Sequence, residues 1–311
     1  MARIFIDGSA GTTGLRIRER LESRRDIKLL TLPEELRKDE RARREIMNEA
    51  DVVFFCLPDA AASEAAAFIE NESTAVIDTS TAHRTAPGWV YGFAELTGRR
   101  EAIGASKRIA NPGCHASGFT ALVAPLVENG IIPNDTRLSC FSLTGYSGGG
   151  KSMIADYEAQ GRDGLLDAPR QYGLAQTHKH LPEMKKECGL DMSPVFCPVV
   201  APYYAGMEVT VPLFRADIRG GAEDIAQVYG EYYKNGLVRF VPNCDEKGFL
   251  SAAAFAGRDD MQITVCGNGE RILLISRFDN LGKGASGAAI QNMNLLLGAD
   301  ETEGLNIGGN V

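Results

Sequence analysis

The sequence predicts an α/β chain: a parallel sheet covered by helices, followed by an α+β region whose sheet is mostly antiparallel. Up to residue 110, short apolar runs alternate with amphipathic segments, and the run at 51–57 is hydrophobic at nearly every position. Such runs are typical of parallel strands buried on both faces. From residue 137 the runs lengthen and alternate apolar with polar residues, which favours antiparallel strands. A length of 311 residues is enough for two domains.

The first elements form a βαβ unit. They are predicted in the order strand 3–7, glycine-rich turn 8–14, helix 15–21 and strand 27–32. Further strands of this part are predicted at 51–57, 75–78 and 108–110. The charged stretch 34–49 mixes both signs, so it is interpreted as the solvated face of a helix and not as a nucleic-acid contact.

The second part is predicted to contain a hairpin and to end in a helix. Its strands are predicted at 137–143, 207–214, 262–265 and 271–276. A glycine turn at 266–270 joins the last two strands. Small and apolar residues at helical spacing then predict a helix over 285–297, with Gly298 as its stop.

Composition excludes several classes of protein. With 44% hydrophobic residues and a net charge of -8, the chain is a globular protein without general attraction to nucleic acid or anionic membranes. Its seven cysteines form no CxxC pair, so neither a structural metal site nor a disulfide framework is expected. The chain has no run of 18 apolar residues and no signal-peptide pattern, so the sequence predicts a cytoplasmic protein.

The turn Gly8-x-x-Gly11-x-x-Gly14 lies where a dinucleotide fingerprint must lie, after the first strand and at the start of the first helix. Glycines there allow a pyrophosphate to approach backbone N–H groups at the helix terminus. The second strand ends in Leu30-Thr31-Leu32-Pro33, without the carboxylate that holds the ribose of NAD. NADP is therefore the expected cofactor, although no particular cation is indicated for its 2'-phosphate.

A second glycine-rich segment, 145–152, matches the Walker A pattern GxxxxGK[ST]. An ATPase would also need a buried strand ending in an aspartate that binds magnesium, and the candidate strand before Asp279 carries Arg277. The match therefore stands alone, and a glycine-rich loop without ATP is the favoured interpretation.

Cys114 is the candidate nucleophile. Pro-Gly before a helix-forming run places it at a helix N-terminus, where the dipole favours the thiolate. The other six cysteines are interpreted as inert small hydrophobes. Either His178 or His180 of the segment HKHLPE is the candidate acid/base, because a histidine titrates near neutral pH. This pair lacks a third nearby metal ligand, and His115 is not expected to act because consecutive helical side chains diverge.

With these features in order, the chain closely resembles the N-acetyl-gamma-glutamyl-phosphate reductases, relatives of aspartate-semialdehyde dehydrogenase, and its length resembles their compact subgroup. The motifs that carry the resemblance are GSAGTTG at the N-terminus, DTSTAHR with WVYGFAEL, NPGC, HKHLPE, and 280–294. The resemblance implies a Rossmann-type NADP-binding domain from 1–114 plus 285–311. Residues 115–284 would be an inserted domain for catalysis and for assembly into a homodimer or homotetramer.

The resemblance also implies the site residues, with Cys114, His178 and His180 catalytic. The cofactor contacts it implies are Gly8, Ser9, Ala10, Gly11, Thr12, Thr13, Gly14, Leu57, Ser80, Asn280, Gly284 and Gln291. The substrate contacts it implies are Arg84, Asn111, Tyr146, Ser147 and Gly148, and Arg84 also lies in a polar loop suited to an anion.

The implied reaction is reduction of an acyl phosphate in arginine biosynthesis. The Cys114 thiolate would displace phosphate, and NADPH would reduce the thioester to the semialdehyde. Two alternatives remain. One is a sibling reductase acting on a different acyl phosphate, such as aspartyl phosphate, and the other is an NADP sensor that uses the same fold without catalysis.

Overall fold

The computed structural model describes residues 1–308, and the chain divides into two compact units. Unit 1 comprises Met1–Pro112 and Ala285–Leu305. Unit 2 comprises Gly113–Gly284 and the segment from Asn306. The chain thus leaves unit 1 just before Cys114 and returns to it just after Gly284.

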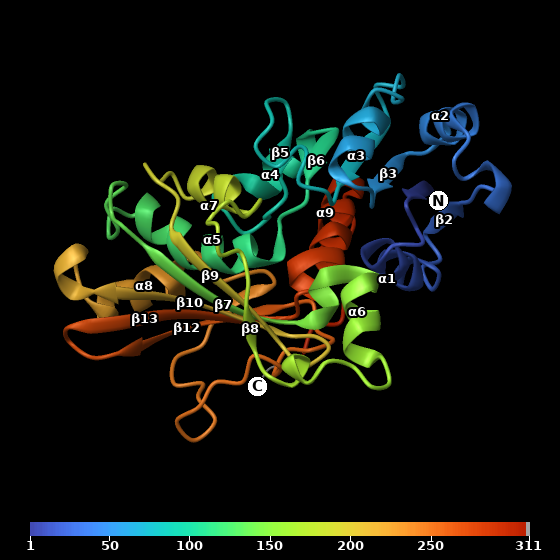
Figure 1. The fold of residues 1–311 in the computed structure, drawn as a ribbon. Helices are drawn as coiled ribbons and strands as arrows, with labels where there is room; N and C mark the ends of the chain where they lie inside the picture. The colour runs from blue at the N-terminus through green and yellow to red at the C-terminus, as the bar shows by residue number, and fades with distance from the viewer. Residues whose placement is uncertain (309–311) are drawn as a thin grey trace. The chain divides into compact units, whose positions relative to one another are not determined.

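Unit 1 is built on a six-stranded parallel sheet in the order β2-β1-β3-β4-β6-β5 (Figure 1). The strands are β1 (Ala2–Asp7), β2 (Ile27–Leu30), β3 (Val52–Phe55), β4 (Ala75–Asp78), β5 (Val90–Tyr91) and β6 (Arg108–Ala110). From β1 the chain adds β2 on one side and β3 on the other, and a ligand crevice lies at the carboxyl ends of strands where such a reversal occurs.

Helices cover both faces of this sheet. They are α1 (Thr12–Leu21), α2 (Glu40–Glu49), α3 (Asp59–Ala66), α4 (Arg99–Ala105) and α9 (Gly287–Leu297), with a 3-10 turn η1 (Glu34–Leu36). Ile17 of α1 and Ile290 of α9 pack in one apolar cluster with the sheet, and Met47 of α2 and Ala62 of α3 pack in another. These two clusters explain why β3 is buried along its whole length.

Two helices differ in detail from the sequence-based expectation. The predicted single helix at 34–49 is divided, because the Asp39 carboxylate accepts a hydrogen bond from the Ala42 N–H at 2.7 Å and caps a new helix. The predicted C-terminal helix begins with a π-helical turn η5 (Gly282–Ser286) before α9, and Gly298 ends it with a φ of 65° as expected.

Unit 2 contains a seven-stranded sheet in the order β11-β12-β13-β10-β7-β9-β8. The strands are β7 (Ser139–Gly145), β8 (Arg170–Gln171), β9 (Val195–Ala201), β10 (Met207–Phe214), β11 (Val238–Phe240), β12 (Met261–Gly267) and β13 (Arg271–Phe278). Most neighbouring strands are antiparallel, as predicted, but β7 with β9 and β11 with β12 are parallel pairs that the sequence did not indicate.

One face of this sheet is covered by helices. The helices of unit 2 are α5 (Cys114–Glu128), α6 (Gly150–Glu158), α7 (Leu181–Glu187) and α8 (Ala222–Tyr232), with the 3-10 turns η2 (Tyr146–Gly149), η3 (Gly164–Asp167) and η4 (Arg215–Asp217). A Cβ on Gly118 would lie 2.5 Å from Val209 Cγ2, so only glycine lets α5 approach β10 this closely. The Tyr233 hydroxyl donates to the Ala121 carbonyl at 2.7 Å and joins the end of α8 to α5.

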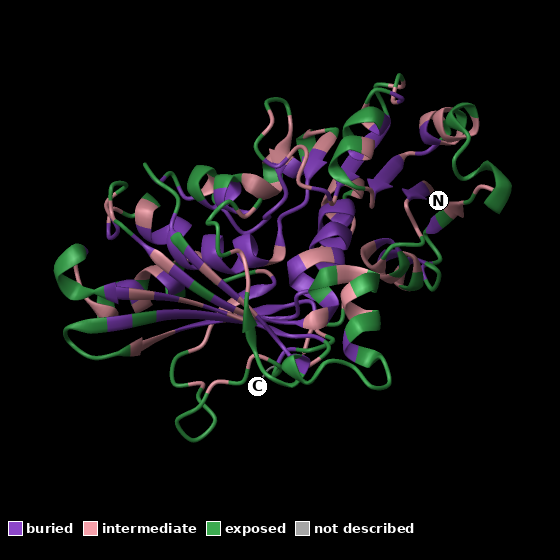
Figure 2. Cartoon of the chain, in the orientation of Figure 1, coloured by how far each residue is buried: buried purple, intermediate pink, exposed green. Residues whose placement is uncertain are grey.

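The opposite face of the same sheet exposes several large apolar side chains. Phe141, Val195 and Leu273 on it are 51%, 57% and 39% exposed, while their strand neighbours Cys140, Phe196 and Leu274 are buried toward the helices. Figure 2 shows the resulting alternation of purple with pink and green along these strands. Exposed apolar side chains grouped on one face of a sheet are typical of a surface that packs against a partner.

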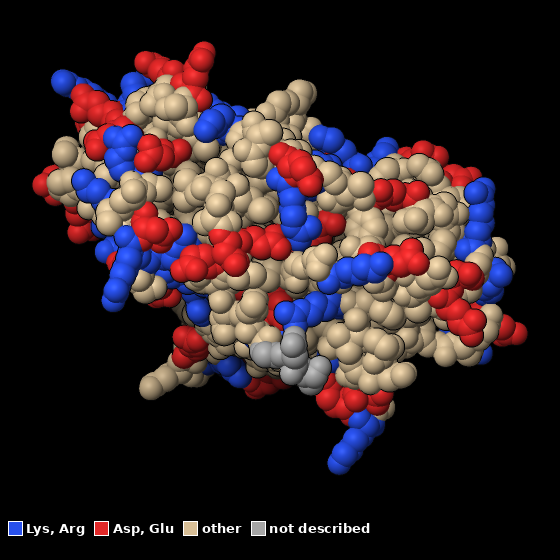
Figure 3. All heavy atoms as spheres, turned by 180° about the vertical axis from the view of Figure 1, so that it is seen from behind, with Lys and Arg blue, Asp and Glu red and all other residues tan. Residues whose placement is uncertain are grey.

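The described surface carries both signs of charge. On the face drawn in Figure 3, Lys and Arg side chains are interspersed with Asp and Glu. Within residues 1–308, no helix combines the length and the apolar character needed to cross a membrane.

Candidate active site

The glycine turn of unit 1 is a tight backbone crossing after β1. Gly8 has a φ of 85°, and a Cβ there would lie 2.3 Å from the Cys56 carbonyl oxygen at the end of β3. A Cβ on Gly14 would lie 2.6 Å from the Gly8 carbonyl oxygen, whereas one on Gly11 would meet nothing closer than 3.4 Å. Gly8 and Gly14 therefore shape the turn, and Gly11, the N-cap of α1, keeps its outer side open for a ligand.

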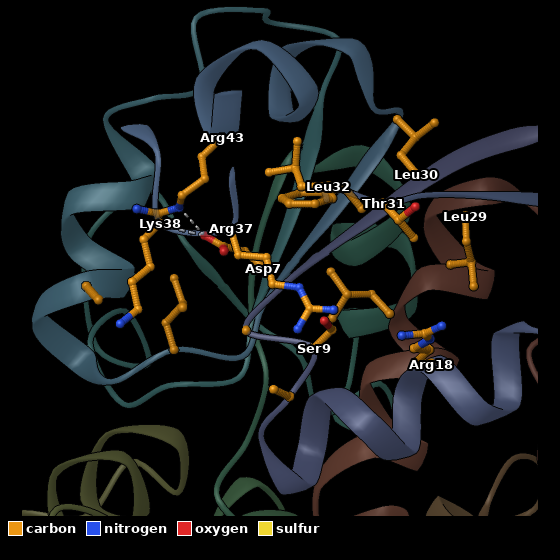
Figure 4. A pocket seen from close by; sticks show the side chains of 16 residues that line it. Asp7, Ser9, Arg18, Leu29, Leu30, Thr31, Leu32, Arg37, Lys38 and Arg43 are labelled. Atoms are coloured by element: carbon orange, nitrogen blue, oxygen red, sulfur yellow. Dashed lines mark hydrogen bonds and ion pairs between the residues drawn. The ribbon is translucent and has the colours of Figure 1, made fainter. Parts of the chain in front are cut away.

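A cavity of about 510 Å³ opens beside this turn (Figure 4). Gly8, Ser9 and Ala10 line it together with Leu57 and the end of β2, whose side chains over 29–32 include no carboxylate. Open backbone at a helix N-terminus, apolar walls and nearby cations are the donor set that a dinucleotide phosphate requires. The residues of this unit thus fit the predicted cofactor.

The loop after β4 is held by its own side chains. The buried Asp78 carboxylate accepts hydrogen bonds from the Ser80 hydroxyl at 2.8 Å and lies 2.6 Å from His83 Nδ1. Arg84 is also buried, and its guanidinium donates to the carbonyls of Asn111 and Thr79 at 2.9 and 3.2 Å. The side chains of Ser80 and Arg84 therefore already use some of their hydrogen-bonding groups in contacts with the protein.

Two other predicted ligand contacts of unit 1 lie in buried networks. The Gln291 amide donates to Glu95 at 2.9 Å from the buried side of α9. The Asn111 amide donates to the Ala285 carbonyl at 3.0 Å and accepts from Asn292 at 3.1 Å. Asn111 thus joins the end of β6 to the segment where the chain returns to unit 1.

Cys114 is the first residue of α5 and is half-buried. The preceding Gly113 is the N-cap, and its N–H donates to the buried Glu183 carboxylate of α7 at 3.1 Å. A Cβ on Gly284 would lie 2.9 Å from the Cβ of Cys114, so the π-helical turn packs directly against the cysteine. The cysteine is therefore held from the α7 side and from the side of the returning chain.

Three histidines gather within unit 2, and one of them, His115, directly follows the cysteine in sequence. The ring centroids of His178 and His180 are 4.7 Å apart, and each lies within 6 Å of the His115 ring, at 5.7 and 5.6 Å. His115 is buried, with Nδ1 2.6 Å from the Ser142 hydroxyl and Nε2 2.6 Å from the Tyr172 hydroxyl. Within residues 1–308, no three His, Cys, Asp or Glu side chains are grouped to hold a metal ion.

Two groups of this cluster, His115 and Tyr172, have pKa values shifted by burial. Burial lowers the pKa of His115 to about 3, with a smaller contribution from His178, so His115 is neutral at physiological pH. Burial raises the pKa of the Tyr172 phenol, and the Cys114 sulfur adds to this rise. The His180 N–H donates to His178 Nδ1 at 3.2 Å, so a neutral His178 carries its proton on Nε2. His115 and Tyr172 thus serve as neutral hydrogen-bonding groups.

The start of the Walker-like segment is bound to the protein itself. The backbone N–H groups of Tyr146 and Ser147 donate to the carbonyls of Tyr203 and Tyr204 at 2.9 and 3.0 Å. The Asn280 amide donates to the Ser147 hydroxyl at 3.0 Å, and its oxygen accepts from the Gly206 N–H at 2.9 Å.

Asn280 and Ser147 therefore join β13 to the loop, and Gly148 is the residue beside them. A Cβ on Gly148 would lie 3.4 Å from the Asn280 amide nitrogen. The ring of Tyr146 stacks on the ring of Tyr157 in α6, with their centroids 4.6 Å apart.

Several residues of this arrangement escaped the sequence analysis. Ser142, Tyr172 and Glu183 are far from Cys114 along the chain, and nothing in their local pattern marks them. Glu183 had one available signal, its place in the HKHLPE segment beside the candidate histidines. For the other cysteines, burial raises the pKa of Cys56 to about 12 and also raises the pKa of Cys140 and Cys188, as expected of inert thiols.

Comparison with known protein families covers both units. Residues 28–105 match the family described as "Semialdehyde dehydrogenase, NAD binding domain", and residues 114–280 match "Semialdehyde dehydrogenase, dimerisation domain". These matches confirm the predicted fold class, the oxidoreductase class and a nicotinamide dinucleotide as the cofactor.

Solved structures share the fold at low sequence identity. Aspartate semialdehyde dehydrogenase II from Vibrio cholerae superposes with a TM-score of 0.72 at 17% identity, covering 96% of this chain and 98% of its own. Aspartate semialdehyde dehydrogenase with NADP from Candida albicans has a TM-score of 0.67 at 16% identity, covering 94% of this chain and 98% of its own.

Curated relatives are much closer in sequence. N-acetyl-gamma-glutamyl-phosphate reductase 2 of Pseudomonas putida is 43% identical over 97% of this chain and 98% of its own. N-acetyl-gamma-glutamyl-phosphate reductase of Brucella suis is 44% identical over 95% of this chain and 99% of its own. Identity at this level over nearly the full length establishes the family that the motifs predicted. The chain therefore belongs to the N-acetyl-gamma-glutamyl-phosphate reductase family and has the semialdehyde dehydrogenase fold.

Proposed function

We propose that the protein reduces N-acetyl-gamma-glutamyl phosphate to N-acetylglutamate 5-semialdehyde with NADPH and releases phosphate, as a step of arginine biosynthesis in the cytoplasm. One observation carries the proposal. A half-buried cysteine begins α5, and the next residue of this helix, His115, lies with its ring centroid within 6 Å of those of His178 and His180. A sulfur nucleophile together with groups that donate and accept protons is the equipment for acyl transfer.

The first step is attack of the Cys114 thiolate on the acyl carbon, with departure of inorganic phosphate and formation of a thioester. The N-terminus of α5 favours the thiolate because its first N–H groups lack partners within the helix and the dipole is positive there. The same N–H groups can stabilise the negative oxygen of the tetrahedral adduct.

The second step converts the thioester into the aldehyde. NADPH, when bound, supplies a hydride to the thioester carbonyl. His178 or His180 then accepts the hydroxyl proton of the thiohemiacetal as its C–S bond breaks, which gives the aldehyde and the Cys114 thiolate. His115 is not assigned this role because it is neutral and bound to Ser142 and Tyr172. Glu183 keeps α7 against the cysteine turn and so positions the histidine segment.

The proposal assigns a role to each unit. Unit 1 binds NADP through residues 8–14 and the cavity beside them, with Leu57 in its wall. Ser80, Asn280, Gly284 and Gln291 remain proposed cofactor contacts, and Arg84, Asn111, Tyr146, Ser147 and Gly148 remain proposed substrate contacts. Ser80, Arg84, Asn111, Asn280 and Gln291 already make hydrogen bonds to other groups of the protein. We therefore expect these side chains to hold the shape of the site as well as to contact a ligand.

Unit 2 is also the proposed assembly surface. Phe141, Val195 and Leu273 on the face of its sheet away from the helices are exposed and apolar, as expected of a surface that a second copy covers. We therefore expect a homodimer or homotetramer. Phe141→Asp should dissociate the oligomer, which light scattering would show as a lower molar mass. The control Leu165→Asp, at an exposed position outside this face, should leave the molar mass unchanged.

The decisive assay is phosphate-dependent reduction of NADP with N-acetylglutamate semialdehyde as the aldehyde that is oxidised and aspartate semialdehyde as the comparison. Turnover that requires phosphate and prefers the longer substrate supports the proposal. Preference for aspartate semialdehyde would identify the sibling reductase instead. An NADP sensor would bind NADP but show no turnover with either aldehyde.

A further inference from the structure

The cavity of unit 1 is lined by four cationic side chains and one carboxylate. Arg18, Arg37, Lys38 and Arg43 line it together with Asp7, the last residue of β1 (Figure 4). In this view Lys38 and Arg43 lie on one side, Leu29, Leu30 and Thr31 lie on the other, and Arg37 lies between them. The glycine turn lines the same cavity, so the cavity extends from the phosphate-binding turn to the end of β2.

Two of these cations are already neutralised by the protein. Arg43 donates to Asp7 Oδ2 at 2.7 Å, and both side chains are largely buried, at 14% and 7% exposure. Arg18 pairs with Glu22 one turn further along α1 at 2.7 Å. Neither guanidinium is therefore available at full charge for a ligand.

Arg37 and Lys38 are different because both are exposed and lie in the turn between η1 and α2. The Glu34 carboxylate approaches Arg37 only to 3.9 Å and is 88% exposed. The Asp39 carboxylate beside Lys38 is engaged as the helix cap of α2. These two cations are the least compensated charges of the cavity, and long flexible side chains can close on an anion.

The chemistry of the β2 end determines which anion fits. In NAD-binding folds a carboxylate at this point holds the ribose hydroxyls, and here the position is Thr31, whose hydroxyl can donate to a phosphate. We propose that Arg37 and Lys38, with Thr31, bind the 2'-phosphate of NADP and determine the preference for NADP over NAD. This inference rests on the proposed cofactor and names the residues that select it.

The test uses full-length protein and the probes 2',5'-ADP and 5'-AMP, which differ only in the 2'-phosphate. The double variant Arg37→Ala/Lys38→Ala is compared by calorimetry with the control Lys28→Ala/Arg41→Ala, which removes the same charge from exposed positions of unit 1 outside the cavity. The wild-type protein should bind 2',5'-ADP at least about 30-fold more tightly than 5'-AMP, because hydrogen bonds to charged groups contribute about tenfold each.

The double variant should lose most of this ratio while its affinity for 5'-AMP changes less than about threefold, and the control should keep the ratio. In steady-state kinetics, Thr31→Glu should move the kcat/KM preference from NADPH toward NADH. The assignment is wrong if Arg37→Ala/Lys38→Ala keeps the affinity ratio of 2',5'-ADP to 5'-AMP. It is also wrong if this variant loses affinity for both probes equally, or if the control loses as much of the ratio as the variant does. If the variant still reduces the substrate with NADH, the proposed function stands whatever the outcome for the 2'-phosphate. If the wild-type protein binds neither probe, the proposed cofactor is wrong.

Discussion

The two units use their residues in different ways. In unit 1 the proposed ligand surface consists of backbone atoms of a glycine turn and of exposed cations that line a cavity. In unit 2 the proposed reacting groups are side chains, and Ser142, Tyr172 and Glu183 make hydrogen bonds to His115 and to the cysteine turn. Substitutions in unit 1 should therefore change cofactor affinity or folding, and substitutions in unit 2 should change kcat.

The largest effect is expected for Cys114→Ser. A hydroxyl is far less ionised than a thiol at neutral pH, so turnover should fall by at least about ten-thousandfold. Because the cysteine belongs to unit 2, calorimetric binding of NADP should remain within a few-fold of the wild type. Residual turnover close to the wild-type rate would contradict the thioester mechanism.

Gly8→Ala should be the next most damaging change, and it acts on folding. The positive φ and a Cβ 2.3 Å from the Cys56 carbonyl oxygen should lower the free energy of unfolding by about 3 kcal/mol. Gly11→Ala is the matched control, because its Cβ meets nothing closer than 3.4 Å. We expect denaturant titrations to show nearly wild-type stability for Gly11→Ala but calorimetry to show weaker NADP binding, which separates the two glycine roles.

The buried His115 predicts a specific pH dependence of stability. Its pKa is lowered from 6.5 to about 3, so the unfolded chain binds a proton that the folded chain does not, and stability is lost as pH falls through this interval. His115→Gln should be destabilised at pH 8 through lost hydrogen bonds, but this loss of stability relative to the wild type should shrink by about 3 kcal/mol at pH 4.5. Parallel stability curves for the two proteins would show that His115 does not titrate in this way.

Tyr172→Phe should have the smallest effect of the series. It removes the hydroxyl that contacts His115 Nε2 at 2.6 Å and leaves the ring. We expect kcat to fall by about tenfold with little change of KM, because the histidine cluster loses one orienting bond while substrate contacts stay. A change confined to KM would mean that Tyr172 binds substrate directly.

The sequence predicted those features that depend on neighbours along the chain. The strand and glycine turn at 3–14, the strand at 207–214 and the helix start at Cys114 follow from local pattern and turn chemistry, and the structure has each of them. The stop at Gly298 belongs to the same class. The parallel pairing of β7 with β9 could not be predicted, because strand partners are chosen by contacts between distant segments.

The same limit applies to the candidate site. Cys114 could be singled out because Pro-Gly before a helical run has a local meaning. His115 was set aside on local geometry, yet the structure buries it between Ser142 and Tyr172 and beside the histidine pair. The Asp7 to Arg43 pair, which joins the end of β1 to α2, also depends on how the chain folds back. Such contacts are tertiary, and the pattern of apolar and polar residues along the sequence does not predict them.

The packing of Gly284 against Cys114 has a practical consequence for protein engineering. The two ends of the segment 113–284, at Gly113 and Gly284, adjoin Cys114, the proposed nucleophile, in sequence or in space. Excising residues 113–284 as a separate fragment, or permuting the chain at either connection, would create a charged terminus or a loose end beside the sulfur. Cut sites for split or permuted versions therefore belong in the exposed surface turns of unit 2.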